Sequence, residues 1–198
     1  MKLITNNGKV LSKNENKIIV SFKKTLKKLL DTTRQSNYLF YYYEGENVNG
    51  LISYSDTENV ISMKSMFYRC TNLQTIPQLN TSNVENIGNM FYACYKLKNI
   101  DISSLDKIDS TSKISSFAYD CRSLTKLIIR NMTVIPPLSS NSFSNCYHFK
   151  GTVNSTYNPE GLKDGRIYVP DNMVDSLKKA TNWSAYADII VPLSTLEE

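Results

Sequence analysis

The chain has 198 residues, 41% of them hydrophobic and 21% charged, which is typical of a folded globular protein and excludes a wholly disordered chain. The formal net charge of +5 at pH 7 is small, and without a compact basic stripe among aromatic residues we expect no binding to nucleic acid. No apolar run is long enough to span a bilayer, and the start at Met1 lacks the apolar core of a secretory signal. We therefore expect no membrane insertion and no signal peptide.

The N-terminal part predicts a β-hairpin followed by a short helix. Val10 and Leu11, a polar break and then alternating apolar residues from Ile18 to Phe22 indicate the hairpin. Apolar residues then recur at helical spacing and predict one buried stripe: Phe22, Leu26, Leu29 and Leu30. The opposite face carries four lysines: Lys23, Lys24, Lys27 and Lys28. We interpret this lysine face as solvated, with an anionic partner as the alternative.

An aromatic segment separates this helix from the rest of the chain. Residues 38–43 read Tyr-Leu-Phe-Tyr-Tyr-Tyr, a strongly β-prone run that ends before Gly45 and Gly50. We expect this run to form a capping layer at the start of the following repeats.

A short phrase that contains cysteine recurs four times and organises the sequence. Its cysteines are 24 to 27 residues apart, a period typical of stacked supersecondary units. A phenylalanine stands three residues before each cysteine except Cys121, where Phe117 stands four residues before it. Either Ala118 takes the aromatic position in that copy or a local bulge restores it. The four cysteines are Cys70, Cys94, Cys121 and Cys146.

These repeats predict the fold class. β-Prone residues follow the cysteine phrase, as at Ile100 and Ile102, and predict a short strand in each copy. We therefore predict an α/β-type repeat solenoid, leucine-rich-repeat-like, with a short strand and a helical or irregular return in each repeat. Residues 1–55 form its N-terminal β/helix segment, which could attach the chain to a larger assembly, and residues 56–153 form the array of four copies.

Residues 154–198 are predicted to form a C-terminal cap. The segment from Arg166 to Pro170 predicts a strand that proline ends, and Asp171 is the expected N-cap of a helix. Apolar residues from Trp183 onward return to the body of the protein. An open end of a repeat array exposes its core, so we expect this segment to cover it.

The cysteines are predicted to be packing residues. No Cys-x-x-Cys pair is present, and zinc sites usually draw their ligands from such pairs, so we expect no metal site. One cysteine per copy at a fixed position predicts a buried ladder of free thiols. Disulfide bonds between neighbouring copies are the alternative.

The sequence predicts no catalytic residues, no cofactor and no enzyme. Nucleophilic catalysis requires a positioned base, and the only histidine is His148, two residues from Cys146. Alternating placement would point these two side chains apart. The acidic residues Asp106 and Asp109 lie in a polar connection and are interpreted as solvated loop charges.

Positions that repeat without needing burial indicate a candidate partner-binding surface. Tyrosines recur two residues before three of the cysteines, and tyrosine and lysine recur just after them. Tyrosine is enriched in protein interfaces. The alternative is that the tyrosines only cover the seams between copies. The candidate residues are Tyr68, Tyr92, Tyr95, Lys98, Tyr119 and Lys126.

The repeat resembles the BspA-type leucine-rich repeats. The residues that carry the resemblance are Thr81-Ser82-Asn83-Val84, Asn89-Met90-Phe91 and Cys94, and the likeness covers about residues 56–153. The segment from Ile167 to Asp171, continued by Ala180 to Trp183, is similar to segments that close such arrays in proteins of gut bacteria and their phages. The resemblance implies a leucine-rich-repeat solenoid used for adhesion or protein binding.

On this basis we expect an interaction or adhesion protein displayed on a phage particle, as a virion or fibre-associated component. Its expected partners are other virion proteins or a protein or glycan of the host surface. Association with further copies of the same chain, as a homo-oligomer, is an additional possibility. The alternative is a protein-binding leucine-rich-repeat module of a bacterium, in the cytoplasm or at the cell surface.

Overall fold

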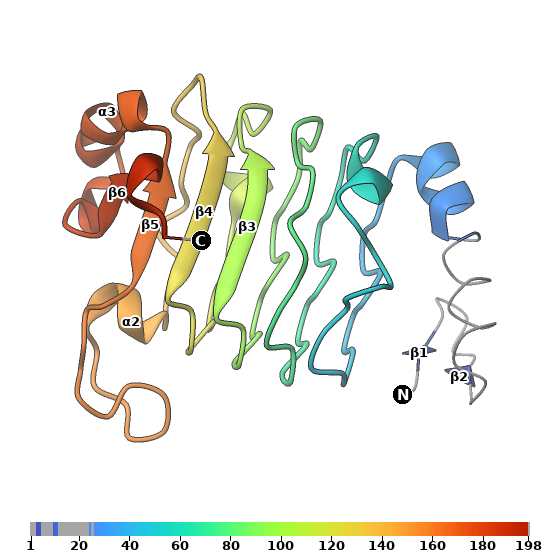
Figure 1. Cartoon of the computed structure of the whole chain (residues 1–198), viewed down its shortest axis with the longest axis horizontal. Helices are drawn as coiled ribbons and strands as arrows, with labels where there is room; N and C mark the ends of the chain where they lie inside the picture. Colours follow the sequence, from blue (N-terminus) through green and yellow to red (C-terminus); the bar gives the residue numbers. More distant parts are fainter. Residues whose placement is uncertain (1–2, 5–9, 12–23, 25, 198) are drawn as a thin grey trace.

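The computed structural model describes residues 3–4, 10–11, 24 and 26–197, and its main sheet has four parallel strands (Figure 1). The strands lie in the order β3-β4-β5-β6 and are β3 (Asn99–Ser104), β4 (Lys126–Asn131), β5 (Arg166–Val169) and β6 (Ile190–Pro192). One row of buried side chains crosses all four strands in register: Ile100, Leu127, Ile167 and Ile190. The sheet therefore joins two copies of the repeat to the C-terminal segment.

The predicted α/β-type, leucine-rich-repeat-like solenoid is wrong. In the described part of the chain, the structure is an all-parallel four-stranded sheet with few helices, and the copies of the repeat have no regular helical return. After residue 34 the α-helices are α2 (Tyr147–Lys150) and α3 (Val174–Lys179). The 3-10 helices are η1 (Ser55–Thr57), η2 (Thr111–Ile114), η3 (Asp171–Met173), η4 (Ser184–Tyr186) and η5 (Leu193–Thr195).

Strand formation differs between the copies because their sequences differ after the cysteine. Ile100 and Ile102 alternate in β3, and both are buried. Pro77 occupies the corresponding stretch of the first copy, where proline removes a backbone donor, and only single bridges form there. In the last copy, Gly151 adopts a left-handed conformation (φ 67°) and ends α2.

The returns are not helical because left-handed residues interrupt them. The residue before each cysteine has a positive φ of 57° to 62°, a conformation that breaks a right-handed helix. These residues are Arg69, Ala93, Asp120 and Asn145. The chain instead makes short turns whose amides donate to the next copy, as from Phe67 N to Met90 O (2.9 Å) and from Phe91 N to Phe117 O (2.8 Å). Neighbouring copies are thus joined by backbone hydrogen bonds away from the sheet as well.

The third copy keeps the backbone hydrogen-bonding pattern of the other copies but carries different side chains at two positions. Cys121 N donates to Ala118 O, as Cys94 N donates to Phe91 O, so Ala118 takes the backbone position of the missing phenylalanine. Phe117 takes the position that Met90 has in the copy before, and it is buried. Its ring packs edge-on against Phe91 at a centroid distance of 5.5 Å. The displaced aromatic ring thus still fills the core.

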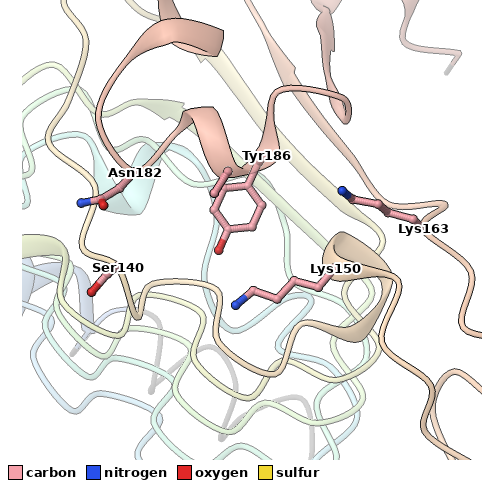
Figure 2. A pocket seen from close by; sticks show the side chains of 6 residues that line it. Ser140, Lys150, Lys163, Asn182 and Tyr186 are labelled. Carbon is pink, nitrogen blue, oxygen red and sulfur yellow. The ribbon is translucent and has the colours of Figure 1, made fainter.

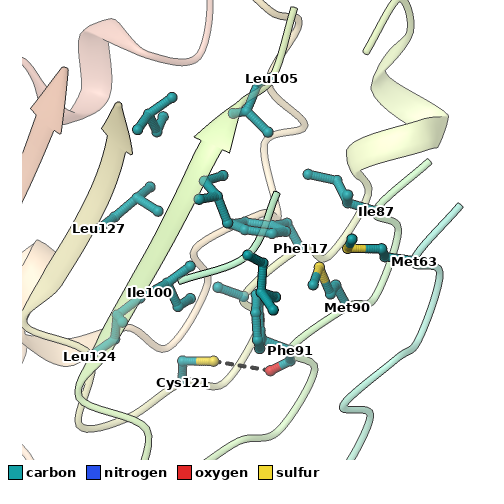
Figure 3. Close-up of a cluster of buried hydrophobic side chains, with 14 of the residues drawn as sticks. Met63, Ile87, Met90, Phe91, Ile100, Leu105, Phe117, Cys121, Leu124 and Leu127 are labelled. Atoms are coloured by element: carbon teal, nitrogen blue, oxygen red, sulfur yellow. Dashed lines mark hydrogen bonds between the residues drawn. The ribbon is translucent and has the colours of Figure 1, made fainter. Parts of the chain in front are cut away.

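The four cysteines are free and buried, as predicted for packing thiols. Each thiol donates to a backbone carbonyl of the preceding copy, with Sγ to O distances of 2.9 to 3.1 Å. Figure 3 shows one of these bonds, from Cys121 Sγ to Phe91 O, within the core around Phe117 and Leu124. The thiol positions the neighbouring backbone in addition to filling space.

The aromatic segment at 38–43 repeats the turn of the cysteine copies and stacks on the first of them, as expected for a layer that begins the array, but its predicted β character is wrong. Phe40 O accepts the thiol of Cys70, and its ring stacks on Phe67 at 5.2 Å with an interplanar angle of 3°. Tyr43 takes the position of a cysteine and is buried. Tyr38 and Tyr42 have positive φ, so the segment forms turns and no strand.

The N-terminal predictions are tested only in part. Val10–Leu11 (β2) pairs antiparallel with Leu3–Ile4 (β1), whereas the predicted partner strand around Ile18 lies outside the described residues. Residues 26–33 are helical as predicted. Leu26 and Leu30 are buried, while Leu29 is 40% exposed. Of the lysine face, Lys24, Lys27 and Lys28 are exposed, and Lys23 lies outside the described residues. No helix in the described ranges is long and apolar enough to cross a membrane.

At the C-terminal end, the predicted strand from Arg166 is confirmed as β5. The predicted helix N-cap at Asp171 is wrong, because its side chain makes no capping bond and instead accepts a hydrogen bond from Ser194 N (3.0 Å). Trp183 is buried beside Phe143 and donates from Nε1 to Pro136 O (2.9 Å). This end of the core is therefore covered by residues after the repeats.

Candidate functional site

Four tyrosine rings form a continuous stacked column on the surface, which we call the tyrosine ladder: Tyr41, Tyr68, Tyr92 and Tyr119. Neighbouring ring centroids are 5.0, 4.8 and 4.9 Å apart, with interplanar angles of 12°, 12° and 7°. Tyr41 is exposed, and the other three are half-buried. Because the ring faces cover one another, the ladder presents ring edges and hydroxyl groups to solvent.

The backbone sets the spacing of the ladder. Each tyrosine stands between residues whose amides donate to the next copy, as Phe67 N and Arg69 N donate to Met90 O and Tyr92 O on either side of Tyr68. Hydrogen-bonded neighbouring chains lie about 4.8 Å apart, which is close to the best separation for stacked rings. The same turn in successive copies therefore places the rings in register.

Two arginines flank the ladder. Arg69 is exposed, and its Nη1 donates to the hydroxyl of Tyr42 (2.9 Å). Arg122 binds both carboxylate oxygens of Asp120, at 2.9 and 3.0 Å, and lies 4.1 Å from the ring centroid of Tyr95. Both guanidinium groups are thus held in fixed places by neighbouring side chains.

The Tyr92 hydroxyl, in the middle of the ladder, has a raised pKa and stays neutral at ordinary pH. Burial raises the pKa of Tyr92, and the neighbouring Tyr68 and Tyr119 raise it further, whereas Arg69 opposes the shift. A neutral phenol both donates and accepts a hydrogen bond. The ladder can therefore bind polar groups of either kind.

A shallow depression of about 410 Å³ lies beside the start of the ladder. Its lining combines aromatic rings with one acidic and one basic side chain: Tyr42, Tyr43, Glu44, Arg69, Thr71 and Tyr95. Arg69 immediately follows Tyr68, so this depression adjoins the ladder. The depression gives the surface beside the ladder a concave part.

The structure brings together only part of the predicted surface. Tyr68, Tyr92 and Tyr119 are in the ladder, and Tyr95 lines the adjoining depression. Lys98 precedes β3 and Lys126 begins β4, where Lys126 N donates to Lys98 O (3.1 Å). The two lysines belong to the start of the sheet, and no contact with the ladder is recorded for them within the described residues. The stacked rings also cover the seams between neighbouring copies, which agrees with the predicted surface and with its alternative alike.

Tyr41 and the two arginines were missed by the sequence prediction. Alignment on cysteine cannot find Tyr41, because Tyr43 stands where its copy would have cysteine. The spacing between Phe40 and Phe67 is 27 residues, which equals the longest spacing between cysteines, and could have revealed it. Arg69 and Arg122 do not share a position in the repeat, so no periodic signal marks them.

Cys146 and His148 do not face each other. The thiol of Cys146 donates to Ala118 O (3.1 Å) in the core. The His148 ring contacts Asp164 through Nδ1 (2.7 Å) and the carbonyl of Tyr157 through Nε2 (3.0 Å). Both ring nitrogens are therefore engaged by groups other than the thiol.

Comparison with known proteins identifies one family. Residues 13–131, more than half of the chain, match the family described as Mycoplasma protein of unknown function, DUF285. The chain belongs to this family. The match contains the whole tyrosine ladder and ends with β4, so the DUF285 region excludes the fourth cysteine copy and the C-terminal segment. No curated protein and no solved structure matches the chain.

Proposed function

We propose that this DUF285 protein is a non-enzymatic interaction protein that binds a protein partner through the tyrosine ladder. The observation that carries the proposal is the unbroken column of four stacked, solvent-accessible tyrosines. Tyrosine and arginine are the residue types most enriched at the energetic centres of protein interfaces, and this surface combines both.

The rigidity of the ladder favours binding. Side chains that are free in the unbound protein lose conformational entropy in a complex, at about 0.5–1.5 kcal/mol each. The rings of Tyr68 and Tyr92 are already ordered by stacking on both sides, and Arg122 is fixed by Asp120. Much of this entropy is therefore lost on folding and not on binding.

The geometry favours a protein over a sugar as the partner. Carbohydrate recognition by aromatic residues uses the open face of a ring, whereas both faces of Tyr68 and of Tyr92 are covered by neighbouring rings. Ring edges that repeat at centroid distances of 4.8 to 5.0 Å, together with their hydroxyl groups, suit the polar and apolar groups of a polypeptide surface.

A capture experiment with matched variants tests the proposal. The full chain is immobilised and exposed to a lysate of the cells or particles in which it occurs, and retained proteins are identified by mass spectrometry. We expect one partner to be retained by the wild type and by Tyr54→Ala, which removes an exposed tyrosine outside the ladder. The double variant Tyr68→Ala with Tyr92→Ala should lose it. Equal retention by all three chains would contradict the proposal.

We further propose that the protein acts on the surface of a phage particle, as a virion or fibre-associated component. This step rests on the resemblance to adhesion proteins of gut bacteria and their phages, and the alternative is an interaction module of a bacterium, in the cytoplasm or at the cell surface. Mass spectrometry of purified particles decides between these locations. Stoichiometric recovery of the chain in particles supports the first, and its absence from them rejects it.

A further inference from the structure

A second recess lies at the C-terminal end of the molecule, outside the region that matches DUF285 (Figure 2). It has a volume of about 300 Å³, and six residues from the last repeat copy and the C-terminal segment line it: Ser140, Lys150, Lys163, Asn182, Ala185 and Tyr186. Lys150 is the last residue of α2, and Tyr186 is the last residue of η4. The recess therefore lies where the fourth copy meets the segment that covers it.

Tyr186 is a buried residue whose hydroxyl opens onto this recess. Its side chain is only 5% exposed, and its ring packs edge-on against Phe143 at 5.3 Å. Figure 2 shows the hydroxyl pointing into the space between Ser140 and Lys150. No hydrogen bond from this hydroxyl is recorded within the described part of the chain. No fully buried side-chain oxygen or nitrogen of the described residues lacks a partner, so the hydroxyl oxygen itself is open to the recess. A ligand that accepts its proton would take the place of water there.

The charges around the recess are predominantly positive. Lys150 is exposed and has no ion pair among the described residues. Lys163 binds Asp188 (2.6 Å), and Lys163, with Arg166 further away, lowers the pKa of that carboxyl group. Asp188 is thus already paired with Lys163. Lys150 is left as an uncompensated ammonium beside the Tyr186 hydroxyl.

The wall opposite Lys150 is fixed by the fold. Asn182 donates from Nδ2 to Leu138 O (2.5 Å), which holds the side chain against the repeat. The residue has a positive φ of 64°, a left-handed conformation that asparagine tolerates better than most residues. The recess therefore has the hydrogen-bonded Asn182 side chain on this side and the exposed ammonium of Lys150 on the other.

We propose that this recess binds a small anionic group, a carboxylate or a phosphate, with the Tyr186 hydroxyl as hydrogen-bond donor and Lys150 as counter-charge. A volume of about 300 Å³ is at the lower limit for a small-molecule site and accommodates one such group. Burial raises the pKa of Tyr186 to about 12, so the phenol keeps its proton at neutral pH and acts as a donor. The inference is independent of the proposed role of the tyrosine ladder.

Titration of the isotope-labelled full chain by NMR tests the inference. Inorganic phosphate and acetate are added separately at constant ionic strength, and the amide signals of Lys150 and Asn182 are followed. We expect saturable shifts with at least one of the two anions. Tyr186→Phe should weaken binding about tenfold or more while it keeps the ring that packs in the core, because hydrogen bonds to charged groups are among the strongest. Lys150→Gln should weaken binding to a similar degree.

Matched variants separate a local site from general attraction to a positively charged protein. Tyr54→Phe and Lys179→Gln, both at exposed positions away from the recess, should bind as the wild type does. The inference is overturned if neither anion gives a saturable shift at the recess. It is also overturned if Tyr186→Phe, with a dispersed native spectrum, binds as tightly as the wild type.

Discussion

Each cysteine in this protein combines a packing role with a hydrogen bond between copies. The Sγ atoms lie 2.9 to 3.1 Å from carbonyl oxygens of the preceding copy, and all four side chains are buried. Burial raises the pKa of Cys94 and of Cys146 well above its ordinary value. Because the thiolate is the reactive form, these residues are chemically protected in the folded state.

Thiol labelling tests this account. We expect a thiol reagent such as Ellman's reagent to leave the native protein almost unmodified at pH 8, because all four thiols are buried and burial raises the pKa of Cys94 and Cys146. In denaturant without reductant, four thiols per chain should react. Fast modification of the native protein would contradict the burial, and fewer than four thiols in denaturant would indicate a disulfide.

Ionisation of Tyr186 makes the free energy of unfolding depend on pH in the alkaline range. Its pKa is raised to about 12 by burial, whereas in the unfolded chain it stays near 10, so the unfolded state loses the proton first as pH rises. The stabilisation is present in full below pH 10 and is lost as pH approaches 12, a change of about 2–3 kcal/mol. Denaturant unfolding at a series of pH values should show a smaller loss for Tyr186→Phe than for the wild type. Parallel curves for the two proteins would refute the assignment.

At the scale of the element, the turn before each cysteine decides the local fold. A left-handed residue stands at this position in all four copies, although none of the four is glycine. Such a residue costs about 1–2 kcal/mol when it carries a side chain with a β-carbon and has no local compensation. In the first three copies the turn persists because the amide of the left-handed residue and the amide two residues before it donate to the next copy, as Arg69 N and Phe67 N do.

Asn145 allows a direct test of this turn, since it is exposed and has a φ of 60°. Asn145→Gly should keep or slightly raise the free energy of unfolding, because glycine adopts this conformation without steric conflict. Asn145→Ala should lower it by about 1 kcal/mol. Chemical denaturation measures both values. If alanine were tolerated as well as glycine, strain at this position would not be a feature of the turn.

Secondary structure could be predicted from the sequence where a single hydrophobic periodicity dominates a segment. The strand from Arg166 and the helix that buries Leu26 and Leu30 follow from alternation and from helical spacing. The returns between strands were not predictable in this way. Left-handed turns carry no single residue type here, since arginine, alanine, aspartate and asparagine all occupy the same position.

Tertiary contacts account for the other differences from the sequence predictions. Residues 38–43 have high β-propensity, yet stacking of Phe40 on Phe67 and turns at Tyr38 and Tyr42 override it. Asp171 has the sequence context of a helix cap but binds Ser194, which is 23 residues away. Three ladder tyrosines were predictable because they share a repeat position, whereas Lys98 and Lys126 share only a composition with interface residues.

At the scale of the whole molecule, the two proposed binding surfaces lie in different parts of the chain. The tyrosine ladder spans copies within the DUF285 region, and the recess at Tyr186 is formed by residues from 140 onward. Variants at the two places share no contacts, so their effects should be independent. We expect Tyr186→Phe to retain the protein partner in full and Tyr92→Ala to retain the binding of phosphate or acetate. Loss of both functions in either variant would show that the sites are one.

The affinity of the ladder variants for the captured partner tests the central claim most directly. With the purified partner, isothermal titration should give a Kd for Tyr92→Ala at least about tenfold higher than for the wild type, as expected for a tyrosine at the centre of an interface. Tyr92→Phe, which keeps the stacked ring, should lose less, and Tyr54→Ala should bind unchanged. An unchanged Kd for Tyr92→Ala, in a protein that remains folded, would contradict the assignment of the tyrosine ladder as the binding surface.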